Sequence, residues 1–107
     1  MQATSKSVVL KLANLAEYQD DSVVSRQITM ADAGNVTLFA FDAGQELSEH
    51  RAPFDALVHV LDGEAEIRIS GQPYTVSEGQ AIIMPANEPH ALKAVRRFKM
   101  LLTMIRA

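Results

Sequence analysis

The chain has 107 residues, of which 48% are hydrophobic and 21% charged, and its formal net charge at pH 7 is -3. This composition is typical of one globular domain and lacks the dense basic surface that binds nucleic acid phosphates. There is no cysteine, which excludes disulfides and thiolate chemistry. No apolar run approaches the ~20 residues of a membrane-spanning helix, so we expect a cytoplasmic protein with residues 1–107 forming a single domain.

The first elements in chain order are a short strand and one helical turn. Residues 6–12 include an apolar stretch that predicts an N-terminal strand, which we expect at the interface between two copies of the chain. Residues 14–20 are the only segment with the pattern of a helical turn. Beyond them, turn signals separate short apolar or alternating runs, which is the pattern of an all-β protein.

Several of the predicted strands are apolar on both faces, as in strands that line an interior and are also covered from outside. They span residues 36–41, 57–61, 81–84 and 100–105. Together with the N-terminal strand, residues 57–61 and 100–105 leave more apolar surface than one small barrel should expose, so we expect a homodimer.

The clearest strand covers residues 64–70, where apolar and polar side chains alternate strictly. The alternation predicts that Ala65, Ile67 and Ile69 are buried, whereas Glu64, Glu66 and Arg68 face solvent.

Glycines mark the predicted strand ends. Gly71-Gln72 suits a two-residue type II′ hairpin, because glycine adopts the positive φ that this turn requires. We expect Gly63, Gly71 and Gly79 to lie in turns between antiparallel strands. At least eight such strands would protect their edges by closing into a barrel or jelly roll.

The candidate chemistry lies in three histidines, His50, His59 and His90. His50 and His90 each follow a turn, and strand alternation directs His90 toward the interior together with Leu92. His59 alternates out of phase with its small apolar neighbours, so we expect it to face a second sheet or a partner.

Residues 44–63 resemble the first conserved motif of the cupin family. Gly44, His50 and Gly63 match its spacing, whereas Ala52 and Ala56 stand where the family has a second histidine and a glutamate.

Residues 79–94 resemble the second cupin motif. Gly79, Pro85 and His90 match it, whereas Asn87 replaces a glycine and Ala94 an asparagine. The resemblance implies a cupin double-stranded β-helix, that is, an all-β jelly-roll barrel.

Cupins with the full motif hold a divalent metal with three histidines and one glutamate. The resemblance therefore implies at most two of these ligands here, His50 and His90, for Fe, Mn, Ni or Zn. Asp55 or Glu49 is the candidate third ligand, and the alternative for Asp55 is a turn residue that accepts hydrogen bonds from backbone N–H groups.

The two alanines at the vacant ligand positions would widen the barrel near its mouth. We therefore expect a pocket for a small organic molecule that is lined by Ala52, Ala56, Met84 and Phe39.

Two functions are compatible with these residues. One is a metal-dependent enzyme of the oxygenase or isomerase type. The other is a non-catalytic module that binds or senses a small molecule without metal, with the histidines forming hydrogen bonds to the ligand. A third metal ligand close to both histidines would favour the enzyme.

Overall fold

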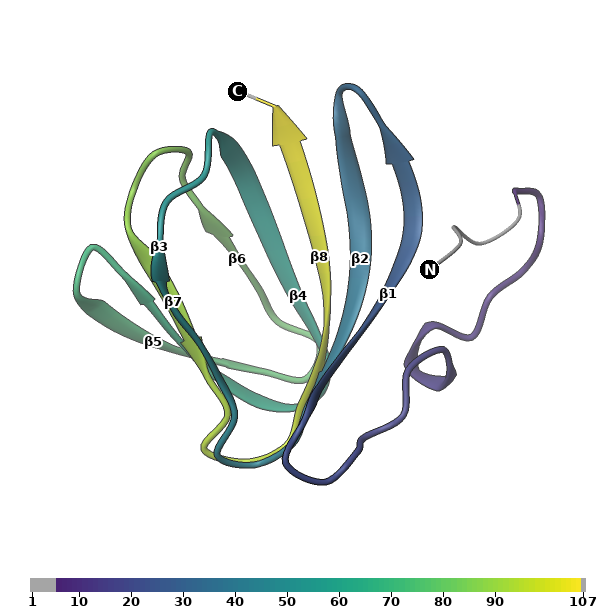
Figure 1. The fold of residues 1–107 in the computed structure, drawn as a ribbon, viewed down its shortest axis with the longest axis horizontal. Helices are drawn as coiled ribbons and strands as arrows, with labels where there is room; N and C mark the ends of the chain where they lie inside the picture. The colour runs from purple at the N-terminus through teal and green to yellow at the C-terminus, as the bar shows by residue number, and fades with distance from the viewer. Residues whose placement is uncertain (1–5, 107) are drawn as a thin grey trace.

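The computed structural model describes residues 6–106, which fold into one short 3-10 turn and eight antiparallel strands (Figure 1). The elements are η1 (Leu12–Asn14), β1 (Val23–Ala31), β2 (Gly34–Phe41), β3 (Glu46–His50), β4 (Phe54–Ile69), β5 (Gln72–Ser77), β6 (Ala81–Met84), β7 (His90–Lys93) and β8 (Phe98–Arg106). This confirms the prediction of an all-β barrel. Within residues 6–106 no helix has both the length and the apolar character needed to cross a membrane.

The strands form two facing sheets that share β4. The first sheet has the order β1, β2, β8, β4, β6, and the second has the order β3, β7, β4, β5. In Figure 1 the two sheets meet at the bottom of the view and diverge toward the top. The 16 residues of β4 pair with β6 and β8 in their first half and with β5 and β7 in their second half.

Gly63 lies where β4 passes from one sheet to the other. The register of β4 against β8 shifts between Val60 and Asp62, and Gly63 has a φ of +75°. A Cβ at this position would overlap the carbonyl oxygen of Arg97. The prediction of a turn at Gly63 is therefore wrong, because a β-bulge bends the strand without reversing it.

The hairpin between β4 and β5 has a different turn from the predicted one. Ile69 pairs with Gln72, which leaves Ser70 and Gly71 as the two loop residues, with φ angles of 50° and 81°. Positive φ at both positions is the requirement of a type I′ turn, so the predicted type II′ turn at Gly71-Gln72 is wrong by one residue. Gly71 and Gly79 do lie in turns, as predicted.

The alternation predicted for residues 64–70 is present, but burial is incomplete at its C-terminal end. Ala65 and Ile67 are completely buried, and Ile69 is partly buried. On the other face Glu64 and Arg68 are exposed and Glu66 is half-buried.

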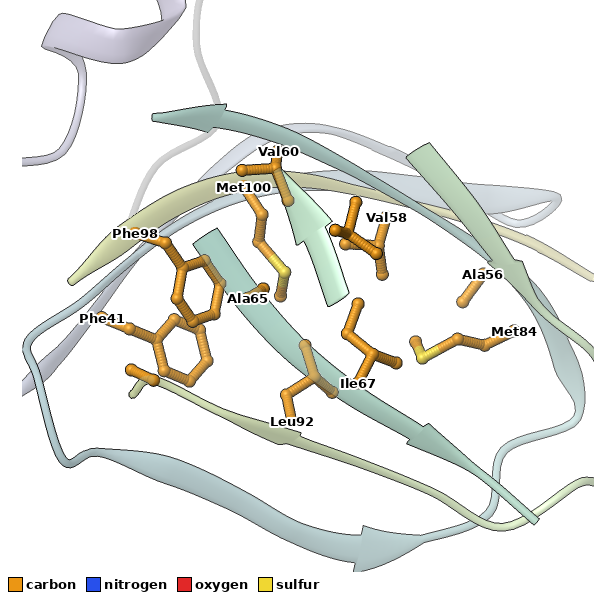
Figure 2. Close-up of a cluster of buried hydrophobic side chains, with 12 residues drawn as sticks. Phe41, Ala56, Val58, Val60, Ala65, Ile67, Met84, Leu92, Phe98 and Met100 are labelled. Atoms are coloured by element: carbon orange, nitrogen blue, oxygen red, sulfur yellow. The ribbon is translucent and has the colours of Figure 1, made fainter. Parts of the chain in front are cut away.

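The core lies between the two sheets (Figure 2). The rings of Phe41 and Phe98 stack with centroids 4.5 Å apart and an angle of 12° between their planes. The other members of this cluster are Ala56, Val58, Val60, Ala65, Ile67, Val76, Met84, Leu92, Ala94 and Met100. Aromatic stacking thus fills the barrel where the sheets are closest.

The predicted N-terminal strand is absent: residues 6–11 form a turn and extended chain without strand pairing, and η1 follows. The residues that follow, 13–18, are held on the barrel by the contacts below and not by strand pairing. Ala16 packs against Leu38 and Ala40 on the outer face of the first sheet. The Tyr18 hydroxyl donates a hydrogen bond to Asp62 Oδ2 at 2.5 Å.

Two cations contact the same tyrosine ring. The Arg97 guanidinium lies 4.6 Å and Lys99 Nζ 5.0 Å from the centroid of the Tyr18 ring. Lys99 Nζ also donates a hydrogen bond to the Ala13 carbonyl at 2.6 Å. Burial, followed by the hydrogen bond to Asp62, raises the pKa of Tyr18, so its hydroxyl stays a proton donor. These contacts fix the N-terminal segment to the barrel.

The bulge at Gly63 predicts that replacing this glycine is costly. Gly63→Ala should lower the free energy of unfolding by more than the ~1–2 kcal/mol of a left-handed alanine, because its methyl group also meets the Arg97 backbone. Gly79→Ala is the matched control, since Gly79 has a φ of +84° but no atom within 4 Å of a Cβ. Urea denaturation measures both variants, and equal losses would contradict the steric role of Gly63.

Candidate functional site

His50 and His90 meet at one end of the barrel. His50 is the last residue of β3 and His90 the first of β7, and the two are register partners after an irregularity in the pairing. Their Nε2 atoms lie 3.1 Å apart, and their ring centroids 4.3 Å apart at an angle of 73°. The motif spacing therefore identified two side chains that the fold brings into direct contact.

The hydrogen bonds of the two rings assign their tautomers. His50 Nδ1 lies 2.9 Å from the Ser48 carbonyl oxygen, and His90 Nδ1 lies 3.2 Å from that of Glu88. A carbonyl oxygen only accepts, so each Nδ1 carries the donated proton. Both Nε2 atoms of the neutral rings then present lone pairs to each other. Such a pair is satisfied by a ligand group that donates a hydrogen bond or by a metal ion.

The two histidines differ in their exposure to solvent. His90 is only 4% exposed, whereas His50 is exposed. Burial lowers the pKa of His90, the nearby His50 lowers it further, and the hydrogen bond to the Glu88 carbonyl opposes both effects. The buried ring is thus held in its neutral form and keeps its Nε2 lone pair available.

Neither candidate third ligand joins the pair. Asp55 lies in β4, where its Oδ1 accepts a hydrogen bond from the Ala86 backbone N–H at 2.9 Å. Asp55 thus accepts a hydrogen bond from a backbone N–H, as the alternative to metal binding predicted, but it lies in a strand and not in a turn. Glu49 is exposed beside His50 on β3. In the part of the chain between residues 6 and 106, no cluster of three or more His, Cys, Asp or Glu side chains could hold a metal ion.

The turn before His90 is fixed by contacts that sequence reasoning missed. Asn87 has a φ of 66°, a conformation that asparagine tolerates better than most residues, which explains why it can replace the motif glycine. Its N–H donates a hydrogen bond to the Ala52 carbonyl at 2.8 Å. The Ser70 hydroxyl donates to Glu88 Oε2 at 2.7 Å. The turn is therefore hydrogen-bonded to the residues that flank both ends of β4.

Inward-facing side chains are fully buried at one end of the barrel and partly exposed at the histidine end. On β8, Phe98 and Met100 have no exposed surface, whereas Leu102 and Met104 are partly exposed. On β4 the same change occurs between Ile67 and Ile69. The inward side chains are thus fully buried around the phenylalanines, whereas Leu102, Met104 and Ile69 toward the histidine end are partly exposed.

The four predicted pocket residues are not equivalent in the structure. Ala56 and Met84 are register partners, are 3% and 2% exposed, and belong to the core. Phe39 is partly buried against that core, and Ala52 lies in the connection between β3 and β4. Met104, which sequence reasoning did not assign to the site, lies on the same register row as Ala56. Its only sequence signal is its place in the alternation of β8.

His59 lies on the outer face of the first sheet. It is partly buried and pairs with Ala81 and Leu101, while its neighbours Val58 and Val60 are completely buried in the interior. This confirms that His59 faces away from the barrel interior and takes no part in the histidine pair.

Comparison with known proteins agrees with the all-β barrel fold described above. Residues 37–105 match the family model described as a cupin domain. The conserved SPY1581 protein of unknown function from Streptococcus pyogenes is 39% identical, with 100% of this chain and 96% of that chain covered and a TM-score of 0.91. A cupin superfamily protein from Desulfitobacterium hafniense is 29% identical over 99% of this chain and 97% of that chain, with a TM-score of 0.90.

A third solved structure is longer. The cupin 2 conserved barrel domain protein from Leptotrichia buccalis is 39% identical and has a TM-score of 0.88, with 90% of this chain but only 47% of that chain covered. No curated protein matches the sequence.

The lowered pKa of His90 predicts a pH-dependent stability. Because folding favours the neutral ring, the stability it contributes is present above the unfolded pKa of about 6.5 and is lost as the pH falls toward the lowered folded pKa. The free energy of unfolding of the wild type should therefore fall more steeply from pH 7 to pH 5 than that of His90→Gln. Identical slopes in chemical denaturation would contradict the assigned environment of His90.

Proposed function

Because this chain belongs to the cupin domain family, we propose that it binds a small organic molecule at the accessible, histidine-bearing end of its barrel. The observation that carries the proposal is the convergence of His50 and His90, with Nε2 atoms 3.1 Å apart. Partly exposed apolar side chains, among them Ile69 and Met104, lie at the same end. A few convergent polar groups with apolar walls are the usual composition of a small-molecule site.

The tautomers of the histidines specify part of the ligand's chemistry. Both Nδ1 atoms donate to backbone carbonyls, which leaves the two Nε2 atoms as acceptors. A ligand hydroxyl or ammonium group that donates a hydrogen bond would satisfy them. We therefore propose a ligand with such a group and an apolar portion that contacts the partly exposed core residues.

A thermal-shift screen with sugars, hydroxy acids and small amines tests this proposal. A compound present at 100 times its Kd should stabilise the wild type by about 2.7 kcal/mol, because it binds only the folded state. The stabilisation should be lost in His50→Ala and His90→Ala, which remove the acceptors. His59→Gln is the matched control, since His59 lies outside the site.

The wild type and His59→Gln should respond equally to each active compound. Compounds that stabilise His50→Ala and His90→Ala as strongly as the wild type would show that binding takes place elsewhere on the molecule.

A second candidate function is metal-assisted chemistry on the same small molecule. Two nitrogen ligands at about 2.0–2.1 Å from a zinc ion, at the tetrahedral angle, lie about 3.3 Å apart. The Nε2 separation of 3.1 Å is close to this value, and both rings have the second-shell carbonyl that metal-binding histidines commonly have. His50 and His90 would hold two positions of a divalent ion, which would supply Lewis acidity. An oxygenase or isomerase activity, one of the two functions expected from the sequence, would require this metal ion.

The donor set favours the metal-free proposal over this second candidate. Divalent sites usually have three or more protein ligands, whereas the described residues 6–106 offer two that converge. The positions of the other two motif ligands are Ala52 and Ala56, which carry no donor atoms in their side chains.

Elemental analysis of protein purified without a histidine tag separates the two candidates. After incubation with Fe, Mn, Ni or Zn salts followed by desalting, the metal-free proposal predicts less than about a tenth of an equivalent of bound metal, since two imidazoles alone make a weak site. Close to one equivalent in the wild type and in His59→Gln, with loss in His50→Ala and His90→Ala, would establish the metal candidate instead.

A further inference from the structure

An arginine and a phenylalanine form the last row of side chains at the histidine end of the first sheet. Phe54 begins β4 and Arg106 ends β8, and the two are register partners. They lie two residues along their strands from Ala56 and Met104, which belong to the interior cluster. Because side chains two residues apart in a strand share a face, Phe54 and Arg106 also lie on the interior side.

This row lies at the same end of the barrel as the histidine pair. Phe54 follows His50 by four residues in the sequence, so their Cα atoms are at most about 14 Å apart even along an extended chain. In Figure 1 the end of β8, the β1–β2 hairpin and the turn before β7 all lie at the top of the view, where the two sheets diverge. Arg106 and the two histidines therefore border the same end of the barrel.

Three contacts hold Arg106 in place. Its backbone N–H donates a hydrogen bond to the Ala33 carbonyl at 2.9 Å, and its Nε donates one to the Asp32 carbonyl at 3.1 Å. Its guanidinium carbon lies 5.2 Å from the centroid of the Phe54 ring, a stacking contact that arginine commonly makes with aromatic rings. The side chain is thus already ordered, which lowers the entropic cost of binding a ligand to it.

The outer end of the guanidinium of Arg106 is left without a partner. Of its five N–H donors, the one on Nε is used. The two Nη atoms have no hydrogen bond or ion pair with any of residues 6–106, and Asp32 contributes its carbonyl and not its carboxylate. A guanidinium with both Nη atoms unpaired offers the planar fork of donors that binds a carboxylate with two parallel hydrogen bonds.

We propose that the barrel binds a hydroxy acid, whose hydroxyl donates to the histidine pair and whose carboxylate binds Arg106. This inference rests on the proposed small-molecule function and adds a second polar anchor to it. The two Nε2 atoms of His50 and His90 are acceptors, whereas the Nη atoms of Arg106 are donors. A carboxylate has no proton to donate to the histidines, and a hydroxyl has no charge to pair with the guanidinium. The ligand therefore needs both groups.

The rest of the ligand follows from the side chains at this end. Met104 and Ile69 are partly exposed and apolar, so the carbon chain that joins the two polar groups should be aliphatic. A hydroxyl, unlike an ammonium group, preserves the net negative charge that the guanidinium attracts.

NMR titrations of the full ¹⁵N-labelled chain with matched probes test the proposal. The probes are hydroxyhexanoates with the hydroxyl on the second, third or terminal carbon, hexanoate, which lacks the hydroxyl, and the hydroxyhexanamides, which lack the charge. The wild type should bind at least one hydroxyhexanoate roughly 10- to 100-fold more tightly than its amide, as expected of hydrogen bonds to a charged group. This comparison does not depend on the stability of any variant.

Two variants assign the groups of the ligand to their partners. Arg106→Gln should weaken the binding of hydroxyhexanoate and hexanoate by a similar factor and leave that of the amide unchanged. His50→Ala should weaken the binding of hydroxyhexanoate and the amide and leave that of hexanoate unchanged. Arg96→Gln is the matched control, because it removes the same charge from an exposed residue in the connection between β7 and β8. It should bind every probe as the wild type does.

Amides that bind the wild type as tightly as the acids, with loss of binding in His50→Ala, would overturn the hydroxy-acid proposal and leave the small-molecule site intact. Acid binding that Arg106→Gln does not weaken, or that Arg96→Gln weakens equally, would also overturn it. If no probe binds, the hydroxy-acid proposal is wrong, and the thermal-shift screen decides separately on the small-molecule site.

Discussion

The passage of β4 from one sheet to the other at Gly63 is the constraint on which the remaining strands depend. One continuous strand pairs with β6 and β8 before the bulge and with β5 and β7 after it. The close approach of the Arg97 carbonyl leaves no room for a side chain at the bend. Both walls of the barrel are therefore positioned by the same strand, and their separation is set where that strand bends.

The accessible end of the barrel follows from this arrangement. Near the bend the sheets are close, and the stacked rings of Phe41 and Phe98 fill the space between them. Farther along the strands the inward side chains become partly exposed, and His90 pairs with Ile69 at that end. The end of the barrel where inward side chains become partly exposed is thus the end that carries the two histidines.

Much of the fold was predictable because its signals are local. The alternation around Ala65 and Ile67 requires only a strand with one buried face, and the motif spacing brings His50 beside His90. Gly63 was misassigned because a glycine in a bulge and a glycine in a turn have the same sequence signal. The two cases differ in the close approach of the Arg97 backbone, which is distant in sequence from Gly63.

The remaining errors also depend on contacts between distant residues. Residues 6–12 have the composition of a strand, but contacts of the following residues with Asp62, Arg97 and Lys99 fix the segment on the barrel without strand pairing. Asp55 caps the Ala86 N–H, which is 31 residues away in the chain, and is therefore not directed to the histidines. No sequence pattern specifies such a partner.

The central claim is that two acceptor nitrogens converge at the accessible end of the barrel. Long-range ¹H–¹⁵N NMR spectra of the histidine rings test it most directly, because they distinguish protonated from unprotonated ring nitrogens. At a pH about one unit above 6.5, imidazoles are mostly neutral. Under these conditions His50 and His90 should both carry their proton on Nδ1 and none on Nε2. Rings that both carry their proton on Nε2, with bare Nδ1 atoms, would contradict the claim.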